Sequence, residues 1–329
     1  MKFAQRRRAA FVHAIAAAVA FAAAAATLPV QAQAPVTRMI VGFAAGGPLD
    51  AVARIISPRL GKALDGQVIV ENRPGANAAI AAETVAKAAP DGRTLWITSV
   101  GAVAMNPTLY PKLPYDPVRD FAPVSLVVNT VEILVVGAGH PAKDAAEFVA
   151  LARKPGSKTT LGSSGTGSVP HLAAELLADV SGARIAHVPY KGVAPAIADS
   201  MAGHIDGLFA DVPVVLESIR AGKLKALGIA APQRHPQLPD VRTLQEQGIN
   251  GVDSDNWYGL FTAKATPPAE LEKLSRALKE TLTDPEVVRQ LAATGLIPAP
   301  TTSDQLRRLL EQDTAKWSKV IRDKKITAE

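Results

Sequence analysis

Two short segments of the chain combine glycines and hydroxyl side chains in a way that suits the binding of a small anion. Glycines in both segments let a ligand approach the backbone closely, because they have no side chain. The hydroxyl groups of the second segment add hydrogen-bond donors to the backbone N–H groups. The candidate ligand-binding residues are Phe43, Ala45, Gly46, Gly47 and Asp50 in the first segment and Ser163, Ser164, Thr166, Gly167 and Ser168 in the second.

Each segment joins a predicted strand to a predicted helix. Pro48 suits the first turn of one helix, and Ser168 is a suitable N-cap for the other. A helix start leaves N–H groups unpaired and has about half a positive charge, so it attracts an anion. Two such turns, facing each other, could hold one carboxylate from opposite sides; alternatively, each is only a tight connection. The binding hypothesis predicts that Gly167→Asp weakens binding without unfolding the protein.

Lys191, Gly192 and Asp211 follow or end other predicted strands and are further candidates. Lys191 either supplies positive charge to the ligand or is solvated, and Gly192 would offer a free N–H group. Asp211 either lines the same cleft or caps the next helix. Asp50 has two readings as well, since it either caps its own helix or orients polar groups of the ligand.

Patterns typical of catalysis are weak in this sequence. The segment 162–165 (GSSG) lacks the spacing of a Gly-x-Ser-x-Gly nucleophile turn, and Pro170 stands where a dinucleotide fingerprint needs its third glycine. No histidine pair has the spacing of metal ligands on a helix, and the chain has no cysteine. The sequence therefore predicts a binding protein without a cofactor or a metal. A hydrolase that uses Ser163 or Ser164 is the enzymatic alternative.

The first 32 residues have the features of an export signal. Four basic residues in positions 2–8 precede an alanine-rich apolar run, and small residues follow at Val30 and Ala32. This order is what a signal peptidase recognises, and we expect cleavage after Ala32 and a periplasmic location. A retained membrane anchor is the alternative, but the apolar run is short for a bilayer about 30 Å thick.

Removal of the signal changes the charge of the chain. The full sequence has 36 basic and 30 acidic residues, and residues 1–32 contain four of the basic ones and none of the acidic ones. The remaining 32 basic and 30 acidic residues nearly balance, so we expect no nucleic-acid partner. The remaining length suits two domains, and the absence of cysteine excludes a disulfide framework.

Predicted strands and helices alternate over most of the chain, which indicates an α/β protein with parallel sheets and helices on their faces. Strands are predicted at 38–42, 67–71, 94–98, 159–162, 185–188, 207–209, 226–230 and 257–261, and helices at 50–64, 79–89, 144–152, 169–180, 195–202, 214–221, 268–282, 285–294 and 303–323. The apolar run 124–136 is long for one strand, so we expect two segments or a passage between domains. A proline-rich connection precedes it.

The chain closely resembles the Bug-type receptors of tripartite tricarboxylate transporters. The motifs that carry the resemblance are 42–47 (GFAAGG), 70–76 (VENRPGA), 90–95 (PDGRTL), 113–117 (LPYDP), 120–124 (DFAPV), 165–168 (GTGS), 187–192 (HVPYKG), 222–227 (GKLKAL) and 239–243 (PDVRT). They occur in the family's order along nearly the whole exported chain.

The resemblance implies a type 2 periplasmic-binding-protein fold, in which two α/β lobes close on a ligand in the cleft between them. We expect one lobe at 35–131 plus 254–329 and the other at 132–253. The resemblance also implies a monomer that captures a small organic acid or an acidic amino acid for the membrane subunits of a transporter. A periplasmic sensor that presents the same ligand to a signalling protein is the alternative.

Two residues depart from the family's pattern. Asn77 stands where the family usually has glycine, and we expect it to contact the ligand or narrow the pocket. Glu132 stands where many members have proline or another neutral residue. A buried negative charge near a carboxylate is unfavourable, so Glu132 either faces solvent or selects a ligand with a cationic group.

Overall fold

The computed structural model describes residues 35–75, 78–254 and 256–327. The described residues from Val36 onward form one compact unit. The predicted signal peptide, its cleavage site after Ala32 and the candidate residue Asn77 lie outside the described residues. Among the described helices, none combines the length and the apolar character that crossing a bilayer requires.

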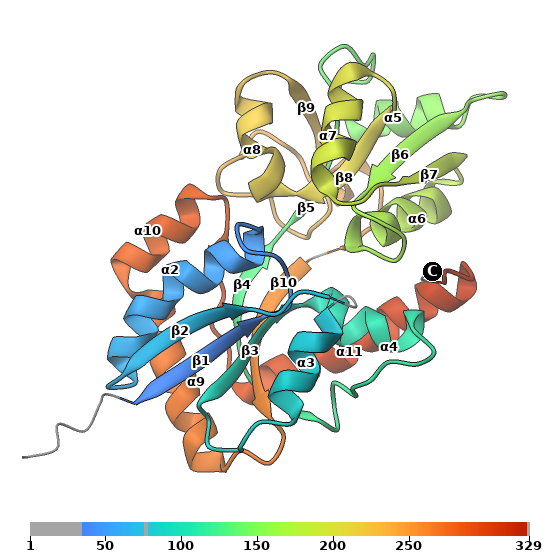
Figure 1. The fold of residues 1–329 in the computed structure, drawn as a ribbon. Coiled ribbons are helices and arrows are strands. Elements are labelled where there is room, and N and C mark those ends of the chain that lie inside the picture. Colours follow the sequence, from blue (N-terminus) through green and yellow to red (C-terminus); the bar gives the residue numbers. More distant parts are fainter. Residues whose placement is uncertain (1–34, 76–77, 255, 328–329) are drawn as a thin grey trace, which may run out of the picture. The chain divides into compact units, whose positions relative to one another are not determined.

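Six strands form the first sheet, in the order β11-β4-β10-β3-β1-β2. β1 runs parallel to both of its neighbours, whereas β10 is antiparallel to β3 and β4. The first three strands, β1, β2 and β3, form the parallel unit that the sequence predicts, and β10, from late in the sequence, pairs with β3 (Figure 1). Its strands are β1 (Val36–Val41), β2 (Gln67–Asn72), β3 (Thr94–Ser99), β4 (Phe121–Thr130), β10 (Asn256–Ala263) and β11 (Ile297–Pro298).

Five strands form the second sheet, in the order β7-β6-β8-β5-β9. β6 is parallel to β7 and β8, and β5 is antiparallel to β8 and β9. The chain enters this sheet directly from β4, with only Val131 between β4 and β5. The strands are β5 (Glu132–Gly137), β6 (Thr159–Ser163), β7 (Ile185–Pro189), β8 (Gly207–Asp211) and β9 (Leu224–Ile229).

Helices cover both faces of each sheet (Figure 1). α2, α9 and α10 pack on one face of the first sheet, and α3 and α11 on the other. In the second sheet, α5 and α6 cover one face, and α7 and α8 cover the other. The helices are α2 (Pro48–Ala63), α3 (Ala79–Ala86), α4 (Asn106–Leu109), α5 (Ala145–Ala152), α6 (Val169–Ser181), α7 (Val193–Ala202), α8 (Val212–Arg220), α9 (Pro268–Thr283), α10 (Pro285–Ala293) and α11 (Ser303–Asp323).

The strands are apolar on both sides because both faces of each sheet are covered. In β3, Trp96 faces one core and its neighbours Leu95 and Ile97 face the other. Trp96 packs against Phe121 with ring centroids 4.8 Å apart and against Tyr115 at 5.7 Å. The α/β class predicted from the sequence is confirmed.

The proline-rich connection after β3 is more ordered than the sequence suggested. A π-helical turn at Gly101–Met105 leads directly into α4. Pro107 lies in the first turn of α4, where a missing N–H group costs nothing. The prolines therefore mark a helix start here as well as turns, and this segment lies at the end of β3.

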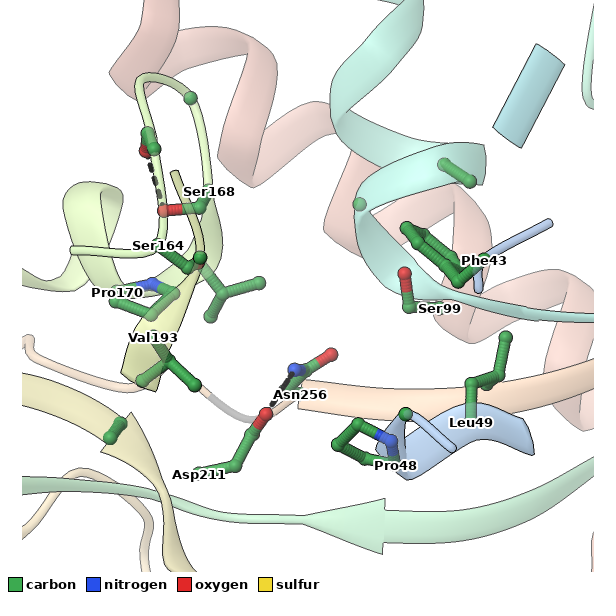
Figure 2. A pocket seen from close by; sticks show the side chains of 18 of the residues that line it. Phe43, Pro48, Leu49, Ser99, Ser164, Ser168, Pro170, Val193, Asp211 and Asn256 are labelled. Atoms are coloured by element: carbon green, nitrogen blue, oxygen red, sulfur yellow. Dashed lines mark hydrogen bonds between the residues drawn. The ribbon is translucent and has the colours of Figure 1, made fainter. Parts of the chain in front are cut away.

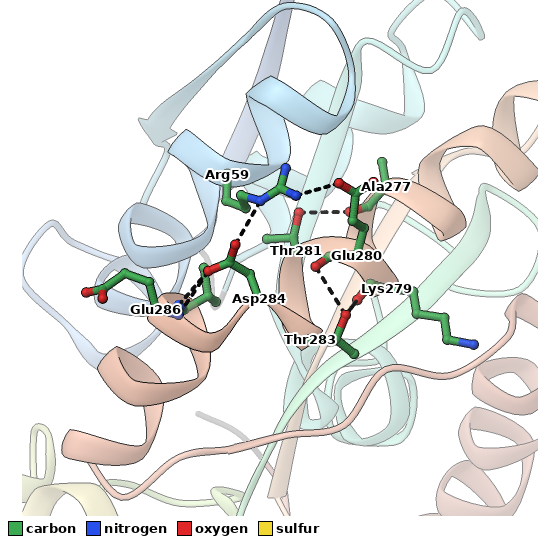
Figure 3. Close-up of polar contacts among 9 residues, drawn as sticks. Arg59, Ala277, Lys279, Glu280, Thr281, Thr283, Asp284 and Glu286 are labelled. Carbon is green, nitrogen blue, oxygen red and sulfur yellow. Dashed lines mark hydrogen bonds and ion pairs between the residues drawn. The ribbon is translucent and has the colours of Figure 1, made fainter.

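α2 is fixed to α9 and α10 by one arginine (Figure 3). Arg59 Nε donates to Asp284 Oδ2 at 3.0 Å, and Arg59 Nη2 donates to Glu280. Asp284 also caps α10, since it accepts hydrogen bonds from the backbone N–H groups of Glu286 and Val287. This contact anchors the body of α2, whose N-terminal end reaches the candidate site.

Candidate functional site

A cavity of about 480 Å³ is lined by residues that belong to, or follow, strands of both sheets (Figure 2). Its size lies within the range typical of small-molecule sites, roughly 300–1,000 Å³. The lining residues are Phe43, Gly47, Pro48, Leu49, Ser99, Gly101, Ala102, Asn106, Tyr110, Ser164, Gly165, Thr166, Gly167, Ser168, Val169, Pro170, Gly192, Val193, Ala210, Asp211, Val214, Asn256 and Tyr258. No lysine, arginine or histidine belongs to this set of described residues.

The start of α2 forms one wall of the cavity. Gly47 is its N-cap, with an extended backbone and no capping side chain, and Pro48 follows in the first turn. Because no side chain caps this end, the first N–H groups of α2 are left for other acceptors. Gly47, Pro48 and Leu49 all line the cavity.

Asp50 holds the loop before α2 in place and does not line the cavity. It is 2% exposed and accepts hydrogen bonds from Gly46 N at 2.9 Å, Arg54 Nε at 2.9 Å and Asn72 Nδ2 at 2.9 Å. Burial raises the pKa of Asp50, but the hydrogen bonds from Arg54, Gly46 and Asn72 outweigh it, so the pKa falls below its usual value. Asp50 thus orients the loop that presents Phe43 and Gly47.

The start of α6 forms a second wall. Ser168 occupies the N-cap position, as predicted, but its hydroxyl group does not cap the helix. Instead, Ser168 Oγ donates to Gly165 O at 2.7 Å, and Gly167 N donates to His171 Nδ1 at 2.9 Å. These two bonds close the 165–168 turn on itself, and α6 keeps unpaired first-turn N–H groups. The N–H group of Gly167 is used inside the turn.

Gly167→Asp would change more than the charge of the turn, and whether this variant stays folded remains a prediction. Gly167 has φ +76°, which side chains other than glycine rarely adopt. A Cβ atom there would lie 2.7 Å from Leu109 Cδ1. A substitution at this position would therefore strain the turn as well as add charge.

Two stacked histidines, the buried His171 and the partly buried His187, support the same turn. His187 Nε2 lies 2.6 Å from Ser163 Oγ, which also contacts the backbone of Gly165. The rings of His187 and His171 are stacked, with centroids 3.6 Å apart. Ser163 is fully buried and does not line the cavity, so its hydroxyl group is placed to hold the turn and not to attack a substrate.

His187 should make stability depend on pH. Burial lowers the pKa of His187 to about 4, aided by His171 and opposed by Glu175. In the unfolded chain, His187 takes up a proton below about pH 6.5, whereas in the folded protein it stays neutral until pH falls towards 4. The contribution of neutral His187 to the free energy of unfolding is therefore complete above pH 6.5 and is lost as pH falls towards 4. We expect His187→Gln to lose about 1 kcal/mol more unfolding free energy at pH 7.5 than at pH 5, measured in urea.

The control for this prediction is His204→Gln, because the His204 side chain is 71% exposed. In His204→Gln, the difference in unfolding free energy between pH 7.5 and pH 5 should stay close to that of the native protein. An equal loss of stability at both pH values in His187→Gln would show that His187 is not held neutral by its surroundings.

A third wall contains polar groups from both sheets. Asp211, at the end of β8, accepts hydrogen bonds from Thr130 Oγ1 at 2.9 Å and from Asn256 Nδ2 at 3.1 Å. Glu132 lies beside Asp211 and is 0% exposed, so of the two alternatives for Glu132 the one in which it faces solvent is wrong. Burial raises the pKa of Glu132 well above its usual value, and the nearby Asp211 carboxylate acts in the same direction.

The cavity brings together eight of the candidate residues, from segments far apart in the sequence. These are Phe43, Gly47, Ser164, Thr166, Gly167, Ser168, Gly192 and Asp211. Five others do not line it: Ala45, Gly46, Asp50, Ser163 and Lys191. Lys191 is exposed, which agrees with the solvated alternative, whereas Asp50 and Ser163 act through hydrogen bonds to the loops.

Several polar lining residues were not among the candidates. Ser99 ends β3, and Asn106 and Tyr110 belong to the segment after it. Asn256 and Tyr258 come from β10. A signal existed for Ser99, since ligands bind at the carboxyl ends of parallel strands. Among the described residues, no group of three or more histidine, aspartate or glutamate side chains is arranged to hold a metal ion.

The chain is similar to known receptor proteins over most of its length. The model of the tripartite tricarboxylate transporter family receptor matches residues 52–326. The protein BugT of Bordetella pertussis is 33% identical over 287 residues, which cover 87% of this chain and 88% of BugT.

Two solved structures share both fold and sequence with this chain. MatC from Rhodopseudomonas palustris, solved with bound malate, is 33% identical with a TM-score of 0.75, covering 89% of this chain and 100% of MatC. Rpa4515 from R. palustris, solved with adipate, is 28% identical with a TM-score of 0.79, covering 91% of this chain and 99% of that protein.

Proposed function

Because the chain belongs to the family of tripartite tricarboxylate transporter receptors, we propose that it captures a small carboxylate in the periplasm for a transporter of that type. The family consists of solute-binding receptors, and the protein is not an enzyme. One observation carries the choice of ligand class: the starts of α2 and α6 line the same cavity. A carboxylate can accept hydrogen bonds from both ends at once.

The cavity lining supports an anion held without a cationic side chain. Backbone N–H groups and the hydroxyl groups of Ser164 and Thr166 are the available donors near α6, and Ser99 adds one from β3. Each helix start contributes about 0.3–1 kcal/mol when exposed and up to about 2 kcal/mol when partly buried. The relatives solved with malate and adipate, both carboxylates, support the same ligand class.

The exported protein is a monomer with two lobes in this proposal. We propose cleavage after Ala32, a monomeric protein, and lobes at 35–131 plus 254–329 and at 132–253. The lobe boundaries are supported by the strands, since those of the second sheet all lie between Glu132 and Ile229. Delivery to membrane subunits is preferred over a sensor role because the family is named for transport receptors.

A thermal-shift screen of the purified protein tests this function. The panel contains small carboxylic acids and, for each, its neutral amide. A ligand that binds only the folded state adds about 2.7 kcal/mol at a hundredfold excess over its dissociation constant. We expect at least one acid to raise the melting temperature while its amide does not. Equal shifts with acid and amide would exclude the carboxylate assignment.

A further inference from the structure

A group of polar side chains lies at the edge of the cavity around Asp211. Asp211 and Asn256 line the cavity, Glu132 is buried beside Asp211, and these three residues are called the acceptor cluster. The backbone brings them together: Glu132 and Asp211 are cross-strand partners in β5 and β8, and Asn256 is the partner of Thr130 in β10 and β4. Cross-strand partners extend from the same face of a sheet, so the two carboxyl groups are neighbours.

One acceptor atom of the cluster lacks a donor. Asn256 Oδ1 is buried and receives no hydrogen bond from the described residues. Asn256 is only 8% exposed, yet it lines the cavity beside Asp211 (Figure 2). A buried acceptor without a donor is destabilising, so this arrangement favours a ligand that brings donors.

The two acceptor oxygens of Asp211 are unequally used. Oδ1 accepts from Thr130 Oγ1 and Asn256 Nδ2, whereas Oδ2 has only a longer contact of 3.3 Å to the same Asn256 nitrogen. Oδ2 therefore retains the capacity to accept further hydrogen bonds. Asp211 itself is partly exposed and lines the cavity.

The charge of the cluster is negative by one unit. Glu132 keeps its proton because it is fully buried beside another carboxyl group, and its hydroxyl group can donate to Asp211. Burial raises the pKa of Asp211 too, against the hydrogen bonds from Thr130, Asn256 and Glu132, which lower it. Of the two carboxyl groups, Asp211 is the one that accepts hydrogen bonds from neighbouring donors and borders the cavity, so we assign the negative charge of the pair to Asp211. Tyr258, the neighbouring phenol, is neutral because burial and both carboxyl groups raise its pKa.

We propose that the acceptor cluster is a subsite for a ligand ammonium group, so that the preferred ligand is a zwitterionic amino acid. This inference rests on the proposed function, which assigns the ligand carboxylate to the starts of α2 and α6. An ammonium group offers three N–H donors, enough for Asp211 Oδ2 and Asn256 Oδ1 together. It also neutralises Asp211, which no described lysine, arginine or histidine in the cavity lining does.

A hydroxyl group or a water molecule satisfies the same acceptors less completely. Either brings donors, but neither compensates the charge of Asp211. A ligand with a carboxylate and a hydroxyl group would place two negative charges in one cavity. A second carboxylate directed at Asp211 would be worse, since it brings a charge and no donor.

Calorimetric titration of the native protein with matched ligands tests the inference. The first set is aspartate, malate and succinate, which have an amino group, a hydroxyl group or a hydrogen atom at the same carbon. The second set is 2-aminoadipate and adipate, which differ in the same way by an amino group. In each set, the group that differs is the one expected to contact Asp211. We expect the amino compound of at least one set to bind 30-fold or more tightly than its counterparts. Binding of the acids without any preference for the amine would overturn the inference and leave the proposed function intact. The absence of binding by every compound would overturn the inference, and the thermal-shift panel of acids and amides then decides the proposed function.

Asp211→Asn gives the second test, because it removes the charge and keeps the shape. We expect the preference for the amine to fall at least tenfold, with unchanged or tighter binding of the deamino acid. Asp206→Asn is the matched control, since Asp206 precedes β8, bonds to Thr160 and does not line the cavity. A preference that persists in folded Asp211→Asn would contradict the subsite. If that variant does not fold, the native titrations decide.

Discussion

Thr166→Asp is expected to weaken carboxylate binding about 100-fold. Thr166 lines the cavity in the turn before α6 and is exposed, so its side chain can change without disturbing the core. For an assumed separation of about 6 Å between an aspartate at position 166 and the bound carboxylate, and an effective dielectric constant of about 20, the repulsion costs about 3 kcal/mol, which corresponds to about two orders of magnitude in affinity.

Thr166→Asn separates charge from shape. It has the same size as aspartate and no charge, so we expect a loss of less than about tenfold. Calorimetry on both variants with the acid identified by thermal shift gives the two affinities. Similar losses in both would mean that Thr166 contributes through its hydroxyl group or its shape. Unchanged affinity in Thr166→Asp would place the anion elsewhere.

Asp50→Ala should remove about 3 kcal/mol of unfolding free energy and weaken ligand binding. The substitution deletes an acceptor for three donors, from Gly46, Arg54 and Asn72, and leaves part of this polar set buried. Hydrogen bonds to charged groups contribute about 1.5–3 kcal/mol each, and the loop that carries Gly47 loses its anchor. Urea denaturation measures the first effect and calorimetry the second.

Glu83→Ala is the matched control for this prediction. Glu83 also pairs with a cation four residues later, Lys87, but its side chain is 40% exposed and that of Lys87 is 77% exposed. Pairs of this kind contribute about 0.3–0.5 kcal/mol, so Glu83→Ala should have little effect on stability and none on affinity. If the two substitutions cost the same, the Asp50 network does not stabilise the loop.

The pattern of apolar residues was sufficient to predict most elements of the fold. Residues 169–180 and 303–323 were predicted as helices and correspond to α6 and α11 with nearly the same bounds. Their apolar residues recur at helical spacing, and glycine or threonine marks an end. The long apolar run at 124–136 is two strands of different sheets, and it looks continuous because almost all of β4 and β5 is buried.

The site was less predictable because its parts come from distant segments. The strand-to-helix turns at Gly47 and Ser168 have local signals, namely glycine, proline and serine next to a helix start. Asn256 has no such signal, since it reaches the cavity only through the pairing of β10 with β4. Glu132 could be recognised as unusual from the sequence, but only the fold shows that it is buried beside Asp211.

The central claim is that a ligand carboxylate binds between the starts of α2 and α6. A crystal structure of the protein with the best acid from the thermal-shift screen tests it directly. We predict a carboxylate within hydrogen-bonding distance of backbone N–H groups near Gly47 and of the Ser164–Ser168 turn. A ligand bound outside this cavity, or one whose only carboxylate contacts Asp211, would contradict the account.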